Sequence, residues 1–401
     1  MFWDKPLDNT LSKLRENVQA PVRVVLWDGR EVSFSQEAPR CTLRLKRASL
    51  ALSRPSLLTL AEAYIDGDAE LEGDVREAIR GAVEIARAMP QPLFQSQGPT
   101  NARHTKRGDR EAIRHHYDVS NEFYQLWLDP RMVYSCAYFR HEGDCLETAQ
   151  LAKLDHICSK LRLKPGERFL DIGCGWGALI FRAAEHYGVE ATGITLSQKQ
   201  HDHVQAEIAR RGLAGRVRVE LRDYQDLPDD ARYDKVASVG MFEHVGVRHF
   251  DTYFGKIQRV LKPGGFVLNH GITHNGLDTR SLGSGMGEFI EDYVFPGGEL
   301  THVSKVIERM AAQGLEAIDA EALREHYART LWHWVERLEA NAETARAEVG
   351  EERFRVWRIY MAGSAYGFER GWMSLWQILA GKPHRDGRLP HPLTRADIYA
   401  S

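Results

Sequence analysis

The chain has 401 residues, of which 43% are hydrophobic and 27% charged, so it is long enough for two folded domains with ordinary cores. Its formal net charge of -3 gives no electrostatic reason to expect nucleic acid as a partner. The five cysteines include no C-x-x-C pair, which excludes a recognisable zinc or disulfide framework and favours a reducing cytosol. We expect neither a signal peptide nor a membrane-spanning segment, which leaves peripheral membrane contact open.

Residues 1–89 are predicted to form a small α+β domain. An Asp-Gly turn between two apolar stretches predicts a hairpin over 22–34. Helices are expected over 56–67, capped by its first serine, and over 74–89, where apolar residues recur at helical spacing. This part of the chain contains no catalytic constellation.

A linker is predicted at residues 90–109, which are rich in proline, glutamine and glycine. Residues 101–114 carry five lysines and arginines against two acidic residues. A solvated loop is the ordinary explanation of such a run. Attraction to anionic lipid headgroups is the alternative.

Strands and helices alternate in the remainder, residues 110–401, which we expect to be a catalytic domain. This order predicts an α/β fold with a mostly parallel, Rossmann-like sheet covered by helices on both faces. The predicted strands are 168–172, 189–194, 216–221, 233–239 and 265–272, and the predicted helices are 147–161, 178–187, 198–211 and 249–261. After residue 298 the chain is expected to be mainly helical, with an apolar stripe at Phe354, Trp357, Met361, Phe368, Trp372, Leu375 and Leu379.

A glycine turn follows the first of these strands, in the stretch Phe169-Leu170-Asp171-Ile172-Gly173-Cys174-Gly175-Trp176-Gly177. Glycines let a backbone turn tightly and approach a ligand, and the helix that follows favours its negative end. The third glycine comes one residue earlier than in the dinucleotide fingerprint, and Thr195-Leu196-Ser197 stands where an acidic residue would hold a ribose. S-adenosylmethionine fits this spacing better than NAD, with its sulfonium near Asp171. A simple turn joining strand to helix is the alternative.

Polar or glycine residues follow several of the predicted strands. In an open parallel sheet the ligand lies beyond the carboxyl ends of the strands. We therefore expect one crevice to be formed by Gly173, Thr195, Asp223, Glu243 and His270.

With these motifs in view, the chain resembles the bacterial cyclopropane-fatty-acyl-phospholipid synthases and the related mycolic acid cyclopropane synthases. The matching motifs are His116-Tyr117-Asp118-Val119-Ser120, Tyr134-Ser135-Cys136-Ala137-Tyr138-Phe139, Leu170 to Gly177, Gly193-Ile194-Thr195-Leu196-Ser197, Met241-Phe242-Glu243-His244-Val245-Gly246 and His326-Tyr327. The resemblance is strong over about 110–380. It is weaker over 1–90, where Leu60 to Gly67 resembles the N-terminal domain of the phospholipid-using branch and favours phospholipid over mycolic acid substrates.

The resemblance implies a class I methyltransferase that transfers the methyl of S-adenosylmethionine to a cis double bond of an acyl chain. A carbocation forms, and bound bicarbonate removes a proton as the cyclopropane ring closes. The implied cofactor positions, to which the strand end adds Asp171, are Tyr134, Ser135, Gly173, Gly175, Thr195, Leu196, Gln200, Tyr224 and Gln225.

Five further positions match the residues that hold bicarbonate in this family: the main-chain amide of Cys136, the side chains of Glu243, His270 and Tyr327, and the backbone of Ile272. Nothing in the sequence pairs the Cys136 thiol with an activating base, so its N–H is expected to be the working group. Tyr138 or Phe139 is expected to ease positive charge through its π face. No metal site is expected.

Two features near the expected acyl site depart from the best-known members. Gly271-Ile272-Thr273 follows His270 where those members have Thr-Ile-Gly, and a Gly-rich segment within 276–290 reads as a lid or binding loop. The alternatives are a methyl or methylene branch instead of a ring, a non-catalytic S-adenosylmethionine-binding or lipid-binding module, and a small-molecule methyltransferase.

The expected partner is an unsaturated phospholipid in the bilayer. We expect the protein to be cytoplasmic and peripherally associated with the inner membrane. The resemblance also implies a homodimer linked through the N-terminal domain.

Overall fold

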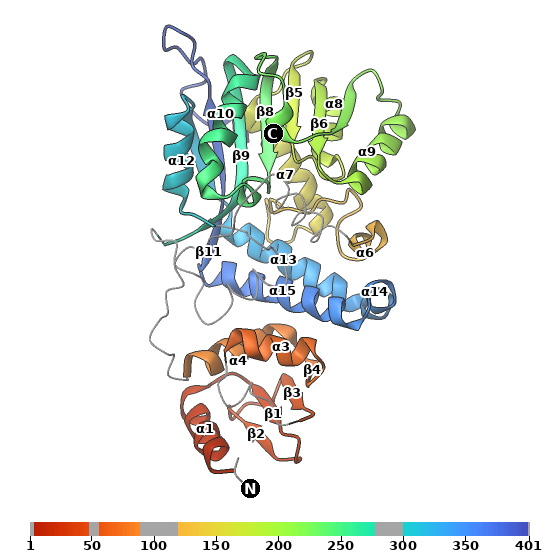
Figure 1. Cartoon of the computed structure of the whole chain (residues 1–401), viewed down its shortest axis with the longest axis vertical. Coiled ribbons are helices and arrows are strands. Elements are labelled where there is room, and N and C mark those ends of the chain that lie inside the picture. Colours follow the sequence, from red (N-terminus) through yellow and green to blue (C-terminus); the bar gives the residue numbers. More distant parts are fainter. Residues whose placement is uncertain (1–3, 48–55, 89–118, 277–299, 400–401) are drawn as a thin grey trace. The chain divides into compact units, whose positions relative to one another are not determined.

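The computed structural model describes residues 4–47, 56–88, 119–276 and 300–399 (Figure 1). They divide into two compact units. Unit 1 contains the described residues up to 88 together with 334–367, and unit 2 contains 119–276, 300–333 and 368–399. The predicted linker, the basic run 101–114 and nearly all of the Gly-rich segment lie outside the described residues.

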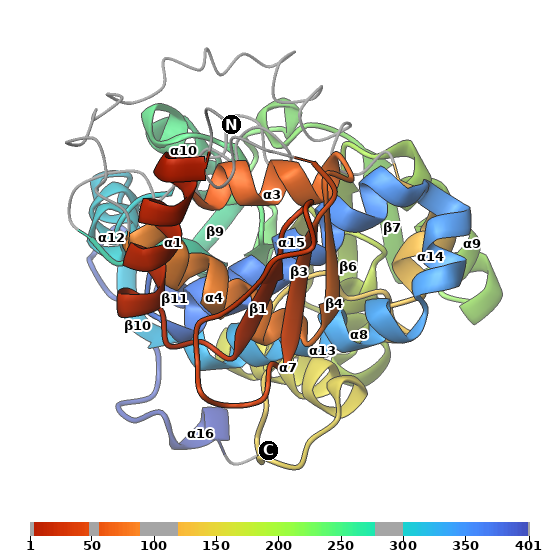
Figure 2. The same ribbon diagram turned by 90° about the horizontal axis from the view of Figure 1, so that it is seen from below.

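Unit 1 is built on a four-stranded sheet with the order β2-β1-β3-β4. β1 (Val22–Val25) and β2 (Glu31–Ser33) pair antiparallel, which confirms the predicted hairpin. β3 (Cys41–Leu45) lies parallel to β1, and β4 (Ala69–Gly73) lies antiparallel to β3. Figure 2 looks at this sheet from below, with β1, β3 and β4 side by side in front of α4.

The helices of the N-terminal part are α1 (Asp4–Asn17), α3 (Leu57–Ile65) and α4 (Val75–Ala88). Ser56 caps α3 as predicted, because its side chain accepts a hydrogen bond from Thr59 N (3.1 Å). α4 packs across β1, β3 and β4, and Ile85 belongs to the core that this packing buries. The predicted α+β composition is confirmed.

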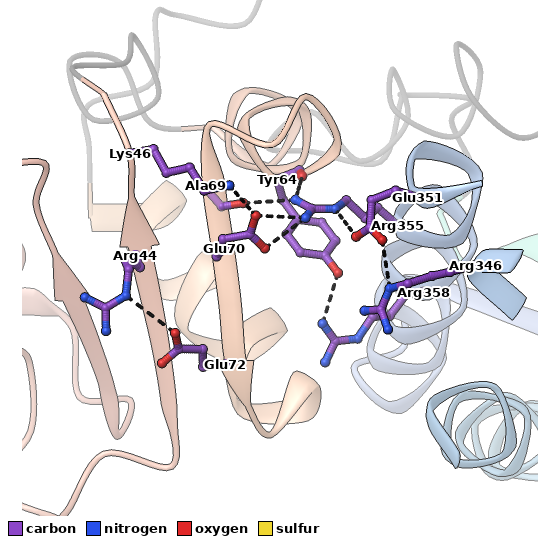
Figure 3. Close-up of polar contacts among 10 residues, drawn as sticks. All are labelled: Arg44, Lys46, Tyr64, Ala69, Glu70, Glu72, Arg346, Glu351, Arg355 and Arg358. Atoms are coloured by element: carbon purple, nitrogen blue, oxygen red, sulfur yellow. Dashed lines mark hydrogen bonds and ion pairs between the residues drawn. The ribbon is translucent and has the colours of Figure 1, made fainter. Parts of the chain in front are cut away.

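The same unit includes α14 (Ala342–Val349) and most of α15 (Glu351–Glu369). Arg355 of α15 is buried and holds β4 and the end of α3 (Figure 3). Its guanidinium donates to the carbonyls of Tyr64 (2.7 Å) and Ala69 (3.2 Å) and to both carboxylate oxygens of Glu70 (2.9 Å each). Chain order did not indicate this grouping of residues almost 300 positions apart.

Unit 2 contains a seven-stranded sheet with the order β10-β11-β9-β8-β5-β6-β7. The five strands from β9 to β7 in this order are parallel, whereas β11 pairs antiparallel with both β9 and β10. The strands are β5 (Arg168–Ile172), β6 (Glu190–Thr195), β7 (Val217–Leu221), β8 (Tyr233–Val239), β9 (Leu261–His274), β10 (Glu316–Ala322) and β11 (Met373–Gly381).

Helices cover both faces of this sheet (Figure 1). Side chains alternate along a strand, so Phe169 of β5 packs with α7, α8 and α9, while the neighbouring Leu170 packs with α10 and α12. These elements confirm the predicted Rossmann-like class I methyltransferase fold. The helices and short 3-10 turns of this part are α6 (Asn121–Gln125), α7 (Leu146–Leu161), α8 (Ala178–Tyr187), α9 (Gln198–Arg211), η1 (Tyr224–Asp226), η2 (Phe242–His244), η3 (Val247–His249), α10 (Phe250–Val260), α12 (Val303–Ala312), α16 (Ala396–Tyr399) and the first part of α13 (Arg324–Ala340), whose residues from 334 on belong to unit 1.

The prediction of a mainly helical C-terminal part was wrong in two places. Residues 316–322 and 373–381 form β10 and β11, so Leu375 and Leu379 lie on a strand, although Phe354 to Phe368 do lie on α15. Nearly every residue of β11 is buried. Such a strand reads as a continuous apolar run, which helical spacing also fits.

The described helices include none that is both long enough and apolar enough to span a bilayer.

Candidate functional site

The glycine turn after β5 forms the floor of a cavity. Gly173, Gly175 and Gly177 have φ angles of 83°, 54° and 86°, a left-handed conformation that glycine adopts without steric cost. The N–H groups of Gly173 and Cys174 donate to the Ile194 carbonyl (3.0 Å each), which ties the turn to the end of β6. The backbone is thereby shaped for close approach of a ligand.

The cavity has a volume of about 160 Å³ and opens at the carboxyl ends of β5, β6 and β8. The structure brings all ten predicted cofactor positions together in its wall: Tyr134, Ser135, Asp171, Gly173, Gly175, Thr195, Leu196, Gln200, Tyr224 and Gln225. Asp223, predicted from its place after a strand, also lines it.

Hydrogen bonds fix several of these side chains. Thr195 Oγ1 donates to Gln200 Oε1 (2.7 Å) and accepts from Ser197 N (3.1 Å), which holds the start of α9 against β6. The Tyr134 ring packs against Tyr124 and Trp127, with centroids 5.7 and 5.4 Å away. The cavity wall is therefore ordered by contacts within the protein itself.

Lys153 of α7 is a cavity residue that the sequence reasoning missed. Its Nζ donates to Ser135 Oγ (2.9 Å), and burial lowers its pKa to about 8, although the charge of Asp129 opposes that change. Burial likewise raises the pKa of Asp171 to about 7, against the attraction of Lys153. A lysine at a core-facing position of the helix 147–161 was the available indication.

Two further lining residues lie on either side of Glu243. Met241 and His244 both face the cavity, and burial lowers the pKa of His244 to about 4, so its imidazole is neutral at pH 7. Neither was singled out from the sequence, because only Glu243 of that motif was assigned a role.

The five predicted bicarbonate positions do not line this cavity; they lie beside it. Gly240 N at the end of β8 donates to the His270 carbonyl (2.8 Å), which joins the segment before Glu243 to β9. Glu243 Oε1 then accepts from Ile272 N (2.6 Å). The structure thus brings Glu243, His270 and Ile272 together at the paired ends of β8 and β9.

Cys136 and Tyr327 reach the same region through neighbouring backbone. Ile272 of β9 is paired with Leu375 of β11, and the Leu375 carbonyl accepts from Leu323 N (2.8 Å). The Leu323 carbonyl in turn accepts from Tyr327 N (3.0 Å) and lies 3.8 Å from Cys136 Sγ. A series of backbone contacts therefore links Ile272 to the segments that carry Cys136 and Tyr327.

Five buried side-chain atoms on β9 and beside it have no hydrogen-bond partner among the described residues: Glu243 Oε2, Asn269 Oδ1, His270 Nε2, Thr273 Oγ1 and Gln377 Oε1. Two of them, Glu243 Oε2 and His270 Nε2, belong to predicted site residues. Burial raises the pKa of Glu243 to about 7, partly offset by the hydrogen bond from Ile272 N. Burial and the positive charges of Lys153 and Lys160 hold the pKa of His270 well below its usual range, so the imidazole is neutral. Buried polar atoms of this kind call for a ligand, because leaving them unpaired is costly.

A small oxyanion with its own hydroxyl fits this pair, since it can offer a donor to Glu243 and an acceptor to His270. The Ile272 N–H is already engaged by Glu243 Oε1.

The Cys136 thiol is fully buried, and burial raises its pKa, which argues against a thiolate nucleophile. Its Sγ lies within hydrogen-bond distance of the Ala137 carbonyl (3.2 Å).

The expectation for Tyr138 and Phe139 needs correction. The rings of His156 and His326 stack on Tyr138 with centroids 4.2 and 4.8 Å away and planes within 16° and 13°, which occupies both of its faces. The His326 and His333 rings lie nearly parallel to Phe139 with centroids 6.3 and 5.6 Å away, and the Arg329 guanidinium lies over the ring, 4.6 Å from its centroid. These π faces are not open to a substrate cation.

In the parts of the chain that the structure describes, no three His, Cys, Asp or Glu side chains gather in a way that could hold a metal ion.

Comparison with known proteins agrees with this geometry. Residues 104–378 match the family model described as mycolic acid cyclopropane synthetase, and residues 10–91 match a domain of unknown function, DUF7884. A "probable fatty acid methyltransferase" of Pseudomonas putida is 47% identical over 389 residues, covering 96% of this chain and 98% of the relative. "Cyclopropane mycolic acid synthase 1" of Mycobacterium tuberculosis is 37% identical over 278 residues, covering 67% of this chain and 96% of the relative.

A solved structure of similar fold is the mycolic acid cyclopropane synthase CmaA1 complexed with SAH and CTAB. It has a TM-score of 0.65 and 36% identity, and the match covers 68% of this chain and 98% of that one.

Proposed function

This chain belongs to the mycolic acid cyclopropane synthetase family of S-adenosylmethionine-dependent methyltransferases, and we propose that it forms cyclopropane rings in the unsaturated acyl chains of membrane phospholipids. The sulfonium methyl would add to a cis double bond, and loss of one proton from that methyl would accompany ring closure. The pair of buried unpartnered atoms, Glu243 Oε2 and His270 Nε2, is the observation that carries this proposal. A methyl transfer that used no bound anion would have no use for these two unpartnered atoms.

Bicarbonate is the oxyanion that the family resemblance implies, and the donor set fits it. When bound, it would supply a weak base for the proton released on ring closure. The residues that would hold it are Glu243 as an acceptor, His270 and Tyr327 as side-chain donors, and Cys136 through its main-chain N–H.

Cation chemistry also requires water to be kept away. Tyr327 of α13 is buried and packs on Phe368 with ring centroids 4.8 Å apart. The cofactor cavity is lined by Met132, Val133, Leu154, Leu179 and other apolar side chains. These contacts support a dry reaction space.

A second candidate product is a methyl or methylene branch. The relative that is 47% identical over nearly the whole chain is described as a probable fatty acid methyltransferase, a name that specifies no ring. The same first step serves both outcomes. They differ in where the proton leaves and whether the second carbon–carbon bond forms.

Product structure decides between the two. We would incubate the purified protein with 13C-methyl S-adenosylmethionine and vesicles of a monounsaturated phospholipid, then record NMR spectra of the extracted lipid. Upfield ring protons would support the proposal, whereas a methyl doublet or an exocyclic methylene would establish the branch. Glu243→Gln is the negative control, and formation of labelled product on free small molecules alone would reject a lipid substrate.

We also propose that the enzyme works at the cytoplasmic face of the inner membrane, with the basic run 101–114 attracting anionic headgroups. A phospholipid substrate requires access to the bilayer, and each basic residue near such a surface contributes about 1 kcal/mol. Charge reversal at Arg103, Lys106 and Arg107 is expected to weaken binding to anionic vesicles. Reversal of three exposed basic residues elsewhere, Lys305, Arg385 and Arg388, is the matched control. Equal binding by both triple variants would refute this role.

A homodimer formed through the N-terminal domain is a further part of this proposal. Light scattering of the full chain would give twice the 45.6 kDa mass of one chain. A monomer at micromolar concentration would argue against it.

A further inference from the structure

We propose that Gln377 is a positioning residue that holds His270 in the tautomer with hydrogen on Nε2, so that this N–H faces the oxyanion. The inference deepens the proposed function and rests on it for the identity of the anion. The tautomer itself does not depend on turnover.

The two residues face one another across β9 and β11. Gln377 is paired directly with His270 in the antiparallel register, so both side chains lie on one face of the sheet. Gln377 Nε2 lies 3.1 Å from His270 Nδ1. The two residues are 0% and 1% exposed, which leaves bulk water no part in fixing the ring.

A neutral imidazole has one donor and one acceptor nitrogen. When the Gln377 amide donates to Nδ1, that nitrogen must be bare and the hydrogen must sit on Nε2. In this arrangement His270 Nε2 is a donor without a partner in the described part of the chain, and Gln377 Oε1 and Glu243 Oε2 are acceptors without one. His270 then has a buried N–H donor available to a ligand.

The opposite orientation of the Gln377 amide would not place a hydrogen on His270 Nε2. The Gln377 oxygen would accept from Nδ1–H, leaving a bare Nε2 lone pair aimed at an anion already beside a carboxyl group. The charged groups around His270 also favour a neutral ring. Lys153, Lys160 and His156 each disfavour a second proton on the ring, so the neutral tautomer is the form that matters.

The test uses full-length protein labelled with 15N-histidine, with the His270 signals assigned by their loss in His270→Asn. Protonated and bare ring nitrogens have separate chemical shifts, so the parent is expected to show a protonated Nε2 and a bare Nδ1. In Gln377→Glu the carboxylate accepts, so the proton is expected to move to Nδ1 or the ring to become doubly protonated. Gln377→Met, which has no strong donor, is expected to show a mixture.

Turnover gives an independent readout. Gln377→Glu is expected to lower kcat by about 10–100-fold and raise the bicarbonate concentration required, with KM for S-adenosylmethionine unchanged. Ile378→Val, on the opposite face of β11, is the control. It should leave kcat, the bicarbonate requirement and KM for S-adenosylmethionine near the parent values. The inference is overturned if the parent shows a bare Nε2, or if Gln377→Glu leaves the tautomer unchanged. A protonated Nε2 in an enzyme that makes no ring would instead reject the proposed function and leave the tautomer assignment standing.

Discussion

The buried carboxyl group of Glu243 is placed for function but lowers the stability of the folded protein when it is ionised. Burial raises its pKa to about 7, so the folded protein binds this proton more tightly than the unfolded chain does. The resulting stabilisation is fully present below the ordinary pKa of a glutamate and is lost as the pH rises through about 7. At higher pH the protein keeps an ionised carboxylate where an uncharged group would be more stable.

Glu243→Gln is therefore expected to abolish ring formation and yet stabilise the protein at pH 8. The gain in the free energy of unfolding is expected to approach about 3 kcal/mol and to shrink towards zero near pH 5. Denaturant unfolding at both pH values measures it, with the exposed Glu190→Gln as control. Equal gains at pH 5 and pH 8 would contradict the link to ionisation.

Cys136 allows a second test of a single residue. Its thiol is buried and the pKa of that thiol is raised, so we assign the contact with the oxyanion to the main-chain N–H, which a serine keeps. Cys136→Ser is expected to retain most of kcat, at a small cost in stability from burying a hydroxyl in the place of a thiol. A loss of turnover as large as that of Glu243→Gln would show that the sulfur itself is required.

The end of β9 explains one departure of this sequence from the best-known family members. Gly271 stands where those members have threonine, and a Cβ built there would lie 2.1 Å from Phe242 Cε1 and 2.8 Å from Glu243 Oε1. Strand β9 and the turn η2 therefore approach so closely that only glycine fits between them. This approach also allows Ile272 N to reach Glu243.

Gly271→Ala is expected to push Glu243 away from Ile272 N and to lower both activity and stability. Overpacking of this kind costs about 1–3 kcal/mol. Gly215→Ala is the matched control, because a Cβ there meets nothing within 4 Å and its φ is not in the left-handed region. Thermal unfolding and the turnover assay would compare the two variants, and similar behaviour would refute the steric argument.

At the scale of the whole molecule, unit 1 joins segments that are far apart in the chain. Arg355 is held by Tyr64, Ala69, Glu70 and Glu351, and its side chain is only 8% exposed (Figure 3). The DUF7884-matching part of the chain thus shares one folded unit with α15, whose residues up to 367 belong to it.

Arg355→Met is expected to destabilise unit 1 by about 3 kcal/mol, because it removes the buried guanidinium that bonds two backbone carbonyls and Glu70, even though Glu70 keeps its bond from Lys46. Arg44→Met is the matched control in the same sheet, since its pair with Glu72 is about half exposed at both side chains and contributes at most about 1 kcal/mol. Denaturant midpoints of the two variants measure the difference. A smaller effect for Arg355→Met than for Arg44→Met would overturn this assignment.

The sequence by itself determined those features that depend only on residues close together in the chain. The turn at Gly173 to Gly177 requires glycine, the alternation of strands and helices repeats at short range, and Ser56 caps the helix that follows it. Because parallel strands place their carboxyl ends at one edge, the sequence correctly assigns Gly173, Thr195 and Asp223 to one cavity, whereas Glu243 and His270, predicted for the same crevice, do not line it.

Only the tertiary structure decided the features that depend on neighbours distant in sequence. β11 reads as helical until its pairing with β9 is seen, and that pairing is what places Gln377 beside His270. Lys153 owes its lowered pKa to burial among distant segments, and Arg355 bonds carbonyls nearly 300 residues away. A side chain's hydrogen bonds and pKa are set by what packs against it, which chain order does not specify.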